Sequence, residues 1–234
     1  QYNKIFGTCR IPCVPLDMLQ FNRKSTHIIV MHKNHFFKMT VFGESKPLSE
    51  RQILENLKCI LAQSTEPAPP IGILTSDNRD CWAKYYKDLM CGNEATLCEI
   101  QQSLFLVCFD DKMPGCDPDY PNKQTKGGHQ FIHGGGSCAN SGNRWFDKTV
   151  QFIIGCDGCL GLTYEHSPSE GQPIAYMVDY LYTFIKKDIG KQIPDNCVNE
   201  VPTKLCFKVN DATNANVEQA KENIDKLVAN FELE

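Results

Sequence analysis

The sequence predicts an α/β protein with a mixed sheet flanked by helices. Segments with strand and helix patterns intermix along the chain, and residues 104–109 are apolar throughout, as expected of a central strand covered on both faces. Residues 149–154 and 160–164 flank Asp157-Gly158, a dipeptide preferred in tight hairpin turns. Because a hairpin pairs its strands antiparallel, we expect a mixed-sheet sandwich of layers and not an all-parallel Rossmann unit.

The first half of the chain carries signals for strands and helices in turn. Residues 27–42 mix β-branched and aromatic residues with polar ones and predict a strand or hairpin. Residues 49–52 form a capping box that opens a helix, and the apolar positions that follow have the helical period: Ile53, Leu54, Leu57, Ile60 and Leu61. After a Pro-rich loop, residues 71–74 predict a short buried strand, and Asp77 is expected to cap a helix ending near Met90.

The second half continues this alternation. A helix is predicted over residues 95–102, and residues 112–124 form a polar, proline-containing loop. Beyond the hairpin, residues 174–186 predict an amphipathic helix, residues 203–209 a late strand and residues 216–230 a closing helix.

Composition restricts the class of protein. A chain of 234 residues is enough for one sizeable domain or two small ones. The net charge of -4 and the absence of a basic stripe argue against a nucleic-acid partner. No apolar run approaches the roughly 18 residues that a membrane span needs, so we expect no transmembrane segment.

The cysteines point to a reducing compartment. All 13 are scattered, the chain is too long to need a disulfide framework, and no Asn-x-Ser/Thr glycosylation site occurs. We therefore expect an intracellular protein with mostly buried thiols. The chain starts at Gln1 without a methionine and shows no signal peptide, so we expect a processed or excised piece.

Two sets of potential metal or redox residues have simpler interpretations. Cys156-Asp-Gly-Cys159 has CxxC spacing, but a redox pair belongs at a helix N-terminus, and no second CxxC completes a zinc site. His27, His32 and His35 share one strand-like run without cysteine or carboxylate at ligand spacing. We expect ordinary strand residues and no metal site, with a thiol redox protein kept as the third-ranked alternative.

Two glycine clusters resemble functional loops only in part. His133-Gly134-Gly135-Gly136 is similar to the oxyanion loop of some esterases, but no Gly-x-Ser-x-Gly nucleophile elbow is present. Gly127-Gly128 is not followed by the Lys-Ser/Thr of a phosphate loop. We expect these glycines to allow close backbone approach to a tunnel or a neighbouring strand.

The segment Tyr164 to Gly171 is the best candidate for catalysis. It places His166 at the end of a strand-like run, followed four positions later by Glu170 and then by a glycine and a helix. Such a histidine, with its loop held by a carboxylate, can present a general base to a cleft. The polar and aromatic segment 143–148 precedes the hairpin that delivers His166 and is either a buttress of the site or a surface salt-bridge cluster.

Together these segments resemble the choline/carnitine acyltransferase family. The matching segments occur in family order: residues 9–12, 70–79, 82–83, 133–137, 140–148 and 164–171. The resemblance implies transfer of an acyl group between coenzyme A and the hydroxyl of carnitine or choline, on a fold similar to chloramphenicol acetyltransferase. It implies His166 as general base, supported by Glu170, Asp147 and Arg144, with coenzyme A or acetyl-CoA as substrate and no permanently bound cofactor.

The resemblance also implies that much of the enzyme is missing. Family enzymes are about twice as long and have two domains, and their Ser-Thr-Ser oxyanion segment does not occur here. We therefore expect residues 1–234 to form one domain, the histidine-bearing half, whose partner is the remaining half of the same enzyme. Without oxyanion stabilisation we expect negligible activity from this piece alone.

Within the family, the expected acceptor is carnitine, with choline as the alternative, and overall similarity favours a short acyl group, acetyl. Cys9-Arg-Ile-Pro, Tyr164 and Glu170-Gly-Gln-Pro-Ile favour carnitine, whereas residues 69–77 and 165–168 favour choline. A carnitine enzyme implies a mitochondrion or peroxisome, and a choline enzyme the cytoplasm. The competing class is a non-catalytic fragment or assembly module in which His166 is idle.

Overall fold

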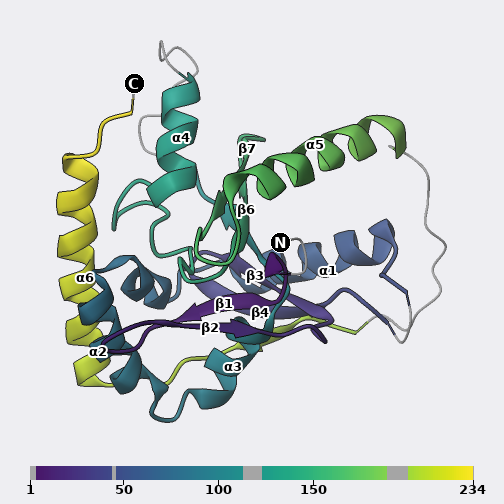
Figure 1. The fold of residues 1–234 in the computed structure, drawn as a ribbon. Helices are drawn as coiled ribbons and strands as arrows, with labels where there is room; N and C mark the ends of the chain where they lie inside the picture. Colours follow the sequence, from purple (N-terminus) through teal and green to yellow (C-terminus); the bar gives the residue numbers. More distant parts are fainter. Residues whose placement is uncertain (1–3, 44–45, 113–122, 189–199, 234) are drawn as a thin grey trace.

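The computed structural model describes residues 4–43, 46–112, 123–188 and 200–233, and the chain is built on a six-stranded mixed sheet (Figure 1). The strand order is β7-β6-β5-β3-β4-β8. The central strands β3, β5 and β6 are parallel, and every other neighbouring pair is antiparallel. The strands are β3 His27–His32, β4 His35–Thr40, β5 Leu106–Asp110, β6 Val150–Gly155, β7 Leu160–Tyr164 and β8 Thr203–Leu205. The predicted α/β mixed sheet and the predicted hairpin at 149–164 are confirmed. Residues 27–42, predicted as a strand or a hairpin, form a hairpin.

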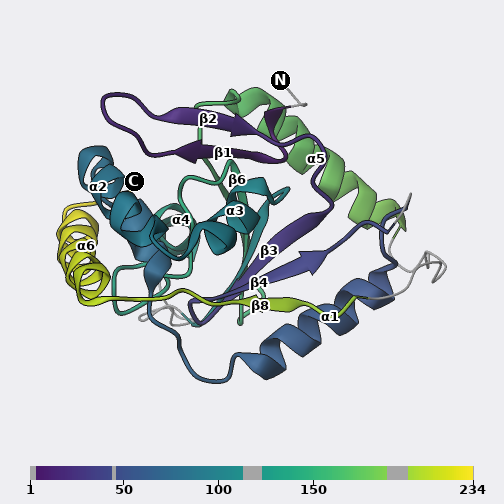
Figure 2. The same cartoon turned by 90° about the horizontal axis from the view of Figure 1, so that it is seen from below.

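Helices lie on both sides of this sheet. Figure 2 shows α1 and α5 on one side and α2, α3 and α6 on the other. The main apolar cluster joins the second group to the sheet and contains Trp82, Trp145 and Phe36, whose rings meet edge to face. The helices are α1 Glu50–Gln63, α2 Arg79–Met90, α3 Glu94–Gln102, α4 Lys123–His133, α5 Gly171–Asp188 and α6 Asp211–Ala229.

Polar side chains cap the N-termini of three helices. Ser49 Oγ accepts from the Gln52 N–H and the Gln52 side chain accepts from the Ser49 N–H, which is the predicted capping box. Asn78, not Asp77, caps α2, by accepting from the Asp80 N–H. Asn210 caps α6 by accepting from the Thr213 N–H, so this helix begins five residues earlier than the predicted start at 216.

The predicted strand at residues 71–74 is wrong. The segment is a buried 3-10 helix, η2 Ile71–Ser76. Its hydroxyls stabilise the tight turns, because Thr75 Oγ1 donates to the Gly72 carbonyl and Ser76 Oγ to the Ile73 carbonyl. A Cβ on Gly72 would lie 2.1 Å from the Arg144 carbonyl oxygen, so only glycine fits this approach. A short apolar run cannot by itself distinguish such a turn from a strand.

Some elements were not predicted. The two-stranded ribbon of β1 Thr8–Ile11 and β2 Met18–Phe21 was missed, as was α4, which contains Gly127 and Gly128. Most of the predicted loop 112–124 lies outside the described residues. The strand predicted at 203–209 is confirmed only over β8. The β6–β7 connection comprises residues 156–159, two residues longer than the predicted two-residue loop.

Candidate active site

His166 lies in the loop between β7 and α5. Its side chain is 62% exposed, and Nε2 lies 3.4 Å from Glu170 Oε2. The ring also lies against Tyr164 at 5.6 Å between centroids. The strand end and the helix start are therefore joined by one short loop that holds an accessible imidazole beside a carboxylate.

Glu165 holds this loop on both sides of His166. Its Oε1 accepts from Ser167 Oγ at 2.6 Å, and both carboxylate oxygens lie 3.2 Å from the Ser167 N–H. On the other side, Arg10 Nη1 donates to Glu165 Oε1 at 2.8 Å. The Glu165 N–H donates to the Thr149 carbonyl and so continues the sheet pairing. Glu165 thus fixes the backbone immediately before and after the imidazole.

Arg10 belongs to a partly buried charge network that contains the buried Asp147. Asp147 is 1% exposed and accepts from Arg79 Nη1 and Trp82 Nε1, each at 2.6 Å. Asp17 accepts from Arg79 at 2.8 Å and lies 2.9 Å from Arg10 Nε. Burial raises the pKa of the Asp147 carboxyl, against the opposing effects of Arg79 and Trp82. Arg10 Nε lies 3.9 Å from Asp147 Oδ1, so Asp147 is linked through Arg10 to Glu165 and the His166 loop.

The network borders an open pocket of about 440 Å³. Its lining combines charged groups of the network with apolar side chains: Arg10, Arg79, Asp147, Glu165, Phe146 and Phe231. A pocket of this size, with a few convergent polar groups, fits the general character of a small-molecule site.

Arg144 is placed elsewhere. Its side chain is fully buried, and Nη1 and Nη2 donate to the two oxygens of Asp110 at 2.6 and 2.7 Å. It also donates to the Gln130 and Asn143 carbonyls. These contacts hold the end of β5 against α4, so the structure brings Asp147 to the His166 loop through side-chain contacts but connects Arg144 to a different part of the core.

Residues 144–148 together bind several elements. The Phe146 N–H donates to Thr75 Oγ1 at 2.9 Å, and Lys148 Nζ donates to the Gln101 carbonyl at 2.8 Å. Lys148 is completely buried, and burial lowers the pKa of its ammonium to about 8. The segment is an internal buttress and not a surface salt-bridge cluster.

The His-Gly-Gly-Gly motif ends α4 in a tight turn. The Gly135 N–H donates to His133 Nδ1 and the Gly136 N–H to Ser141 Oγ, so both amides already have partners. Gly134 has φ +78°, and a Cβ there would lie 2.7 Å from the backbone of Asn140. The expected close backbone approach is therefore present at Gly134, toward a turn and not a neighbouring strand.

The other candidates have structural partners. His27 and His35 lie 2.8 Å from the carbonyls of Glu99 and Glu66, and His32 contacts the Ser64 hydroxyl. Within the described part of the chain, no three His, Cys, Asp or Glu side chains gather as metal ligands. Cys156 is an exposed free thiol, and Cys159 is a half-buried cysteine outside any disulfide.

Comparison with known proteins identifies the family. The model for choline/carnitine O-acyltransferases matches residues 1–234, the whole chain. The chain belongs to the choline/carnitine O-acyltransferase family. It is 37% identical to carnitine O-acetyltransferase of Rattus norvegicus and of Homo sapiens, and 33% identical to choline O-acetyltransferase of Danio rerio. Each comparison covers 100% of this chain but only 38% of the relative.

Membership in the acyltransferase family is consistent with the network around His166, which sequence reasoning found only in part. His166, Glu170 and Asp147 were predicted, but the roles of Arg10 and Glu165 were missed. Both residues lay within segments that carried the family resemblance, and their opposite charges were the available signal. In the described ranges, none of the helices is long and apolar enough to cross a membrane.

Proposed function

We propose that this protein transfers a short acyl group, an acetyl group, between coenzyme A and the hydroxyl of carnitine, with His166 as general base. The observation that carries the proposal is the accessible imidazole beside Glu170, on a loop that Glu165 fixes on both sides of His166. The names of the relatives support the reaction class, and the carnitine enzymes among those compared are the more similar.

The chemistry requires one base. A hydroxyl with a pKa far above 7 attacks a thioester slowly unless its proton is removed as the new bond forms. In the proposed step His166 takes that proton, the oxygen bonds to the acyl carbon, the carbon–sulfur bond breaks, and the thiolate of coenzyme A receives the proton. Glu170 would hold one ring nitrogen so that the other accepts the proton.

We also propose that residues 1–234 are one half of a two-domain enzyme, with a fold similar to chloramphenicol acetyltransferase. The chain spans 38% of the length of the relatives compared, which leaves room for a partner domain with oxyanion donors and coenzyme A contacts. On this proposal the partners are the remaining half and the small-molecule substrates, and the chain alone is inactive.

Choline is the second candidate acceptor. Residues 69–77 and 165–168 resemble choline enzymes, and choline O-acetyltransferase of Danio rerio is 33% identical over the whole chain. An activity assay with both acceptors distinguishes carnitine from choline.

The test measures thiol release from acetyl-CoA by the full-length natural protein, with carnitine and choline in parallel. We expect turnover with carnitine, abolished by His166→Ala and retained by His35→Ala, a histidine whose Nε2 donates to the Glu66 carbonyl. Turnover with choline alone would reassign the acceptor. A folded protein inactive with both acceptors would favour the non-catalytic module.

Glu165→Gln provides a sharper test of the loop. Loss of its carboxylate breaks the Arg10 ion pair and loosens the loop, so kcat should fall about 10- to 100-fold while KM for the acceptor changes less. Glu218→Gln on α6 is the matched control, because that carboxylate is exposed and pairs with Lys221 on the surface. Equal activity in both variants would contradict the role of Glu165.

A further inference from the structure

The two faces of the central sheet are buried to different extents. On the side of α2, α3 and α6, the β5 residues Leu106 and Cys108 are both 0% exposed. On the opposite side, Val107 of β5 and Phe152 and Ile154 of β6 remain partly exposed. Central parallel strands are normally covered on both faces. One face of this sheet therefore lacks part of its cover.

The helix α5 continues this incomplete surface. Its apolar stripe starts at Ile174, which is 4% exposed, and Met177 packs on the cluster that contains Phe152. Further along the same stripe, Leu181 is half-buried and Ile185 is 50% exposed. The apolar side chains of α5 are thus buried at its start and exposed at its end. This pattern is typical of a helix whose second half packs against a partner that is not present.

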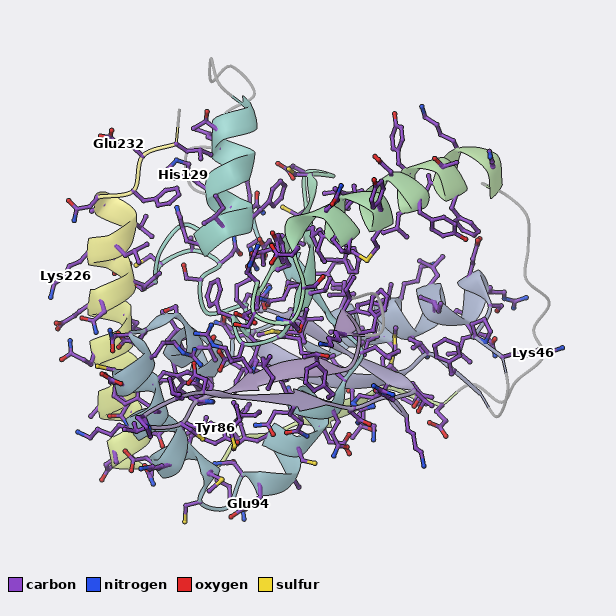
Figure 3. All side chains as sticks on the ribbon, in the orientation of Figure 1. Lys46, Tyr86, Glu94, His129, Lys226 and Glu232 are labelled. Atoms are coloured by element: carbon purple, nitrogen blue, oxygen red, sulfur yellow. The ribbon has the colours of Figure 1, made fainter. Side chains whose placement is uncertain are left out.

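Aromatic side chains enlarge the uncovered area. Tyr180 and Tyr182 are 69% and 60% exposed, and Tyr180 stacks on Phe184 at 6.4 Å between centroids. Figure 1 shows α5 reaching away from β7, and Figure 3 shows side chains projecting from both sides of it. We call the exposed residues of α5 together with the partly exposed sheet residues the α5 surface: Tyr176, Val178, Tyr180, Tyr182, Phe184, Ile185, Val107, Phe152 and Ile154.

The charge pattern of α5 is that of an interior helix. Asp179 is the single charged residue between Gly171 and Ile185, and the lysines follow only at 186 and 187. Helices that lie on membranes have a strongly charged polar face, usually rich in lysine and arginine. A contiguous apolar patch on a protein normally marks a contact with another polypeptide.

We propose that the α5 surface is covered by polypeptide of the same protein that lies outside these 234 residues. Three observations favour this occupant: the partly exposed face belongs to central strands, relatives are more than twice as long as the chain, and α5 begins five residues after His166. The same cover would thus enclose the proposed catalytic loop. The inference rests on the proposed division into two domains, and it adds the surface at which they meet.

The test substitutes charges into the α5 surface of the full-length natural protein. Tyr180→Lys combined with Phe184→Lys should lower Tm by at least about 5 °C, because both lysines would enter a covered apolar contact. Leu227→Lys is the matched control: it is 49% exposed on α6, away from this surface, and should shift Tm by less than about 2 °C. In the 234-residue chain alone, the double substitution should behave like the control.

A second measurement guards against a variant that fails to fold. Hydroxyl-radical oxidation of unsubstituted Tyr180 and Tyr182 should be at least 10-fold slower in the full-length protein than in the 234-residue chain. Equal oxidation, or a natural protein that comprises only these residues, would overturn the proposal. So would protection that appears only in a dimer or with lipid vesicles. Neither readout measures acyl transfer, so the two proposals can fail separately. His166→Ala should remove activity and leave both Tm and the protection of Tyr180 and Tyr182 from oxidation unchanged.

Discussion

Replacing Asp110 by asparagine should reveal the cost of a buried guanidinium. Arg144 is fully buried and donates to both Asp110 oxygens at 2.6 and 2.7 Å. Without that carboxylate, the positive charge retains only neutral acceptors, among them the carbonyls of Gln130 and Asn143. Removing one partner of a buried ion pair costs about 3–5 kcal/mol, so Asp110→Asn should lower the free energy of unfolding by that amount.

The double variant Asp110→Asn, Arg144→Met should be more stable than Asp110→Asn alone. It removes both charges, and replacing a whole buried pair by apolar or neutral groups is often close to neutral. Adding the second substitution should therefore restore most of the free energy of unfolding that Asp110→Asn removes. The non-additivity of the two substitutions measures the coupling of the two groups.

Urea unfolding followed by tryptophan fluorescence measures these effects, because Trp82 and Trp145 are both buried. With a slope of about 3 kcal/mol per M, Asp110→Asn should move the midpoint down by at least about 1 M. Arg51→Met is the control, since this arginine is exposed, pairs with Glu55 on the surface of α1 and should contribute less than about 1 kcal/mol. If Asp110→Asn costs no more than this control, or if the double variant is as unstable as Asp110→Asn, the buried-charge argument is wrong.

Three further predictions follow from single residues. Gly72→Ala should cost about 1–3 kcal/mol in urea unfolding, because its Cβ would collide with backbone oxygens, whereas Gly158→Ala meets no atom within 4 Å and should cost only about 1 kcal/mol for its positive φ. Burial lowers the pKa of His133 to about 4, so the unfolded chain binds the extra proton. Stability should therefore fall as pH drops from 6.5 toward 4, by up to about 1.4 kcal/mol per unit, and His133→Gln should flatten that slope in unfolding curves. Burial raises the pKa of Cys108 to about 12, so alkylation at neutral pH with peptide mapping should label exposed Cys156 and spare Cys108; equal labelling would contradict the packing.

Elements that depend on local chemistry were predictable from the sequence. The Ser49 capping box and the Asp157-Gly158 turn are short-range signals, and both lie where expected. Residues 71–76 and α4 depend instead on distant contacts. Gly72 fits against the Arg144 carbonyl, and Phe131 of α4 occupies the space that a side chain on Gly161 would need. Neither fit is visible in a window of neighbouring residues.

The candidate site divides in the same way. His166 and Glu170 are four positions apart, so the sequence could place them on one loop. The ion pair between Arg10 and Glu165 joins residues 155 positions apart. It forms because β1 passes beside Lys148 and Thr149, and the Thr149 carbonyl also accepts from the Glu165 N–H at the end of β7. Sequence spacing could not reveal that Asp147 reaches the loop through Arg10 while Arg144 is paired with Asp110.

The buttress at residues 144–148 has a consequence for how the protein opens. Its side chains and amides bind partners at residues 75, 79, 101 and 110. These contacts therefore all join residues that are far apart in the sequence. None of these partners can detach while the others stay folded without breaking a buried contact. In the 234-residue chain alone, amide protons here, such as that of Phe146, should therefore exchange with solvent only when the whole structure unfolds. Those in the outer half of α5 should exchange through local fraying.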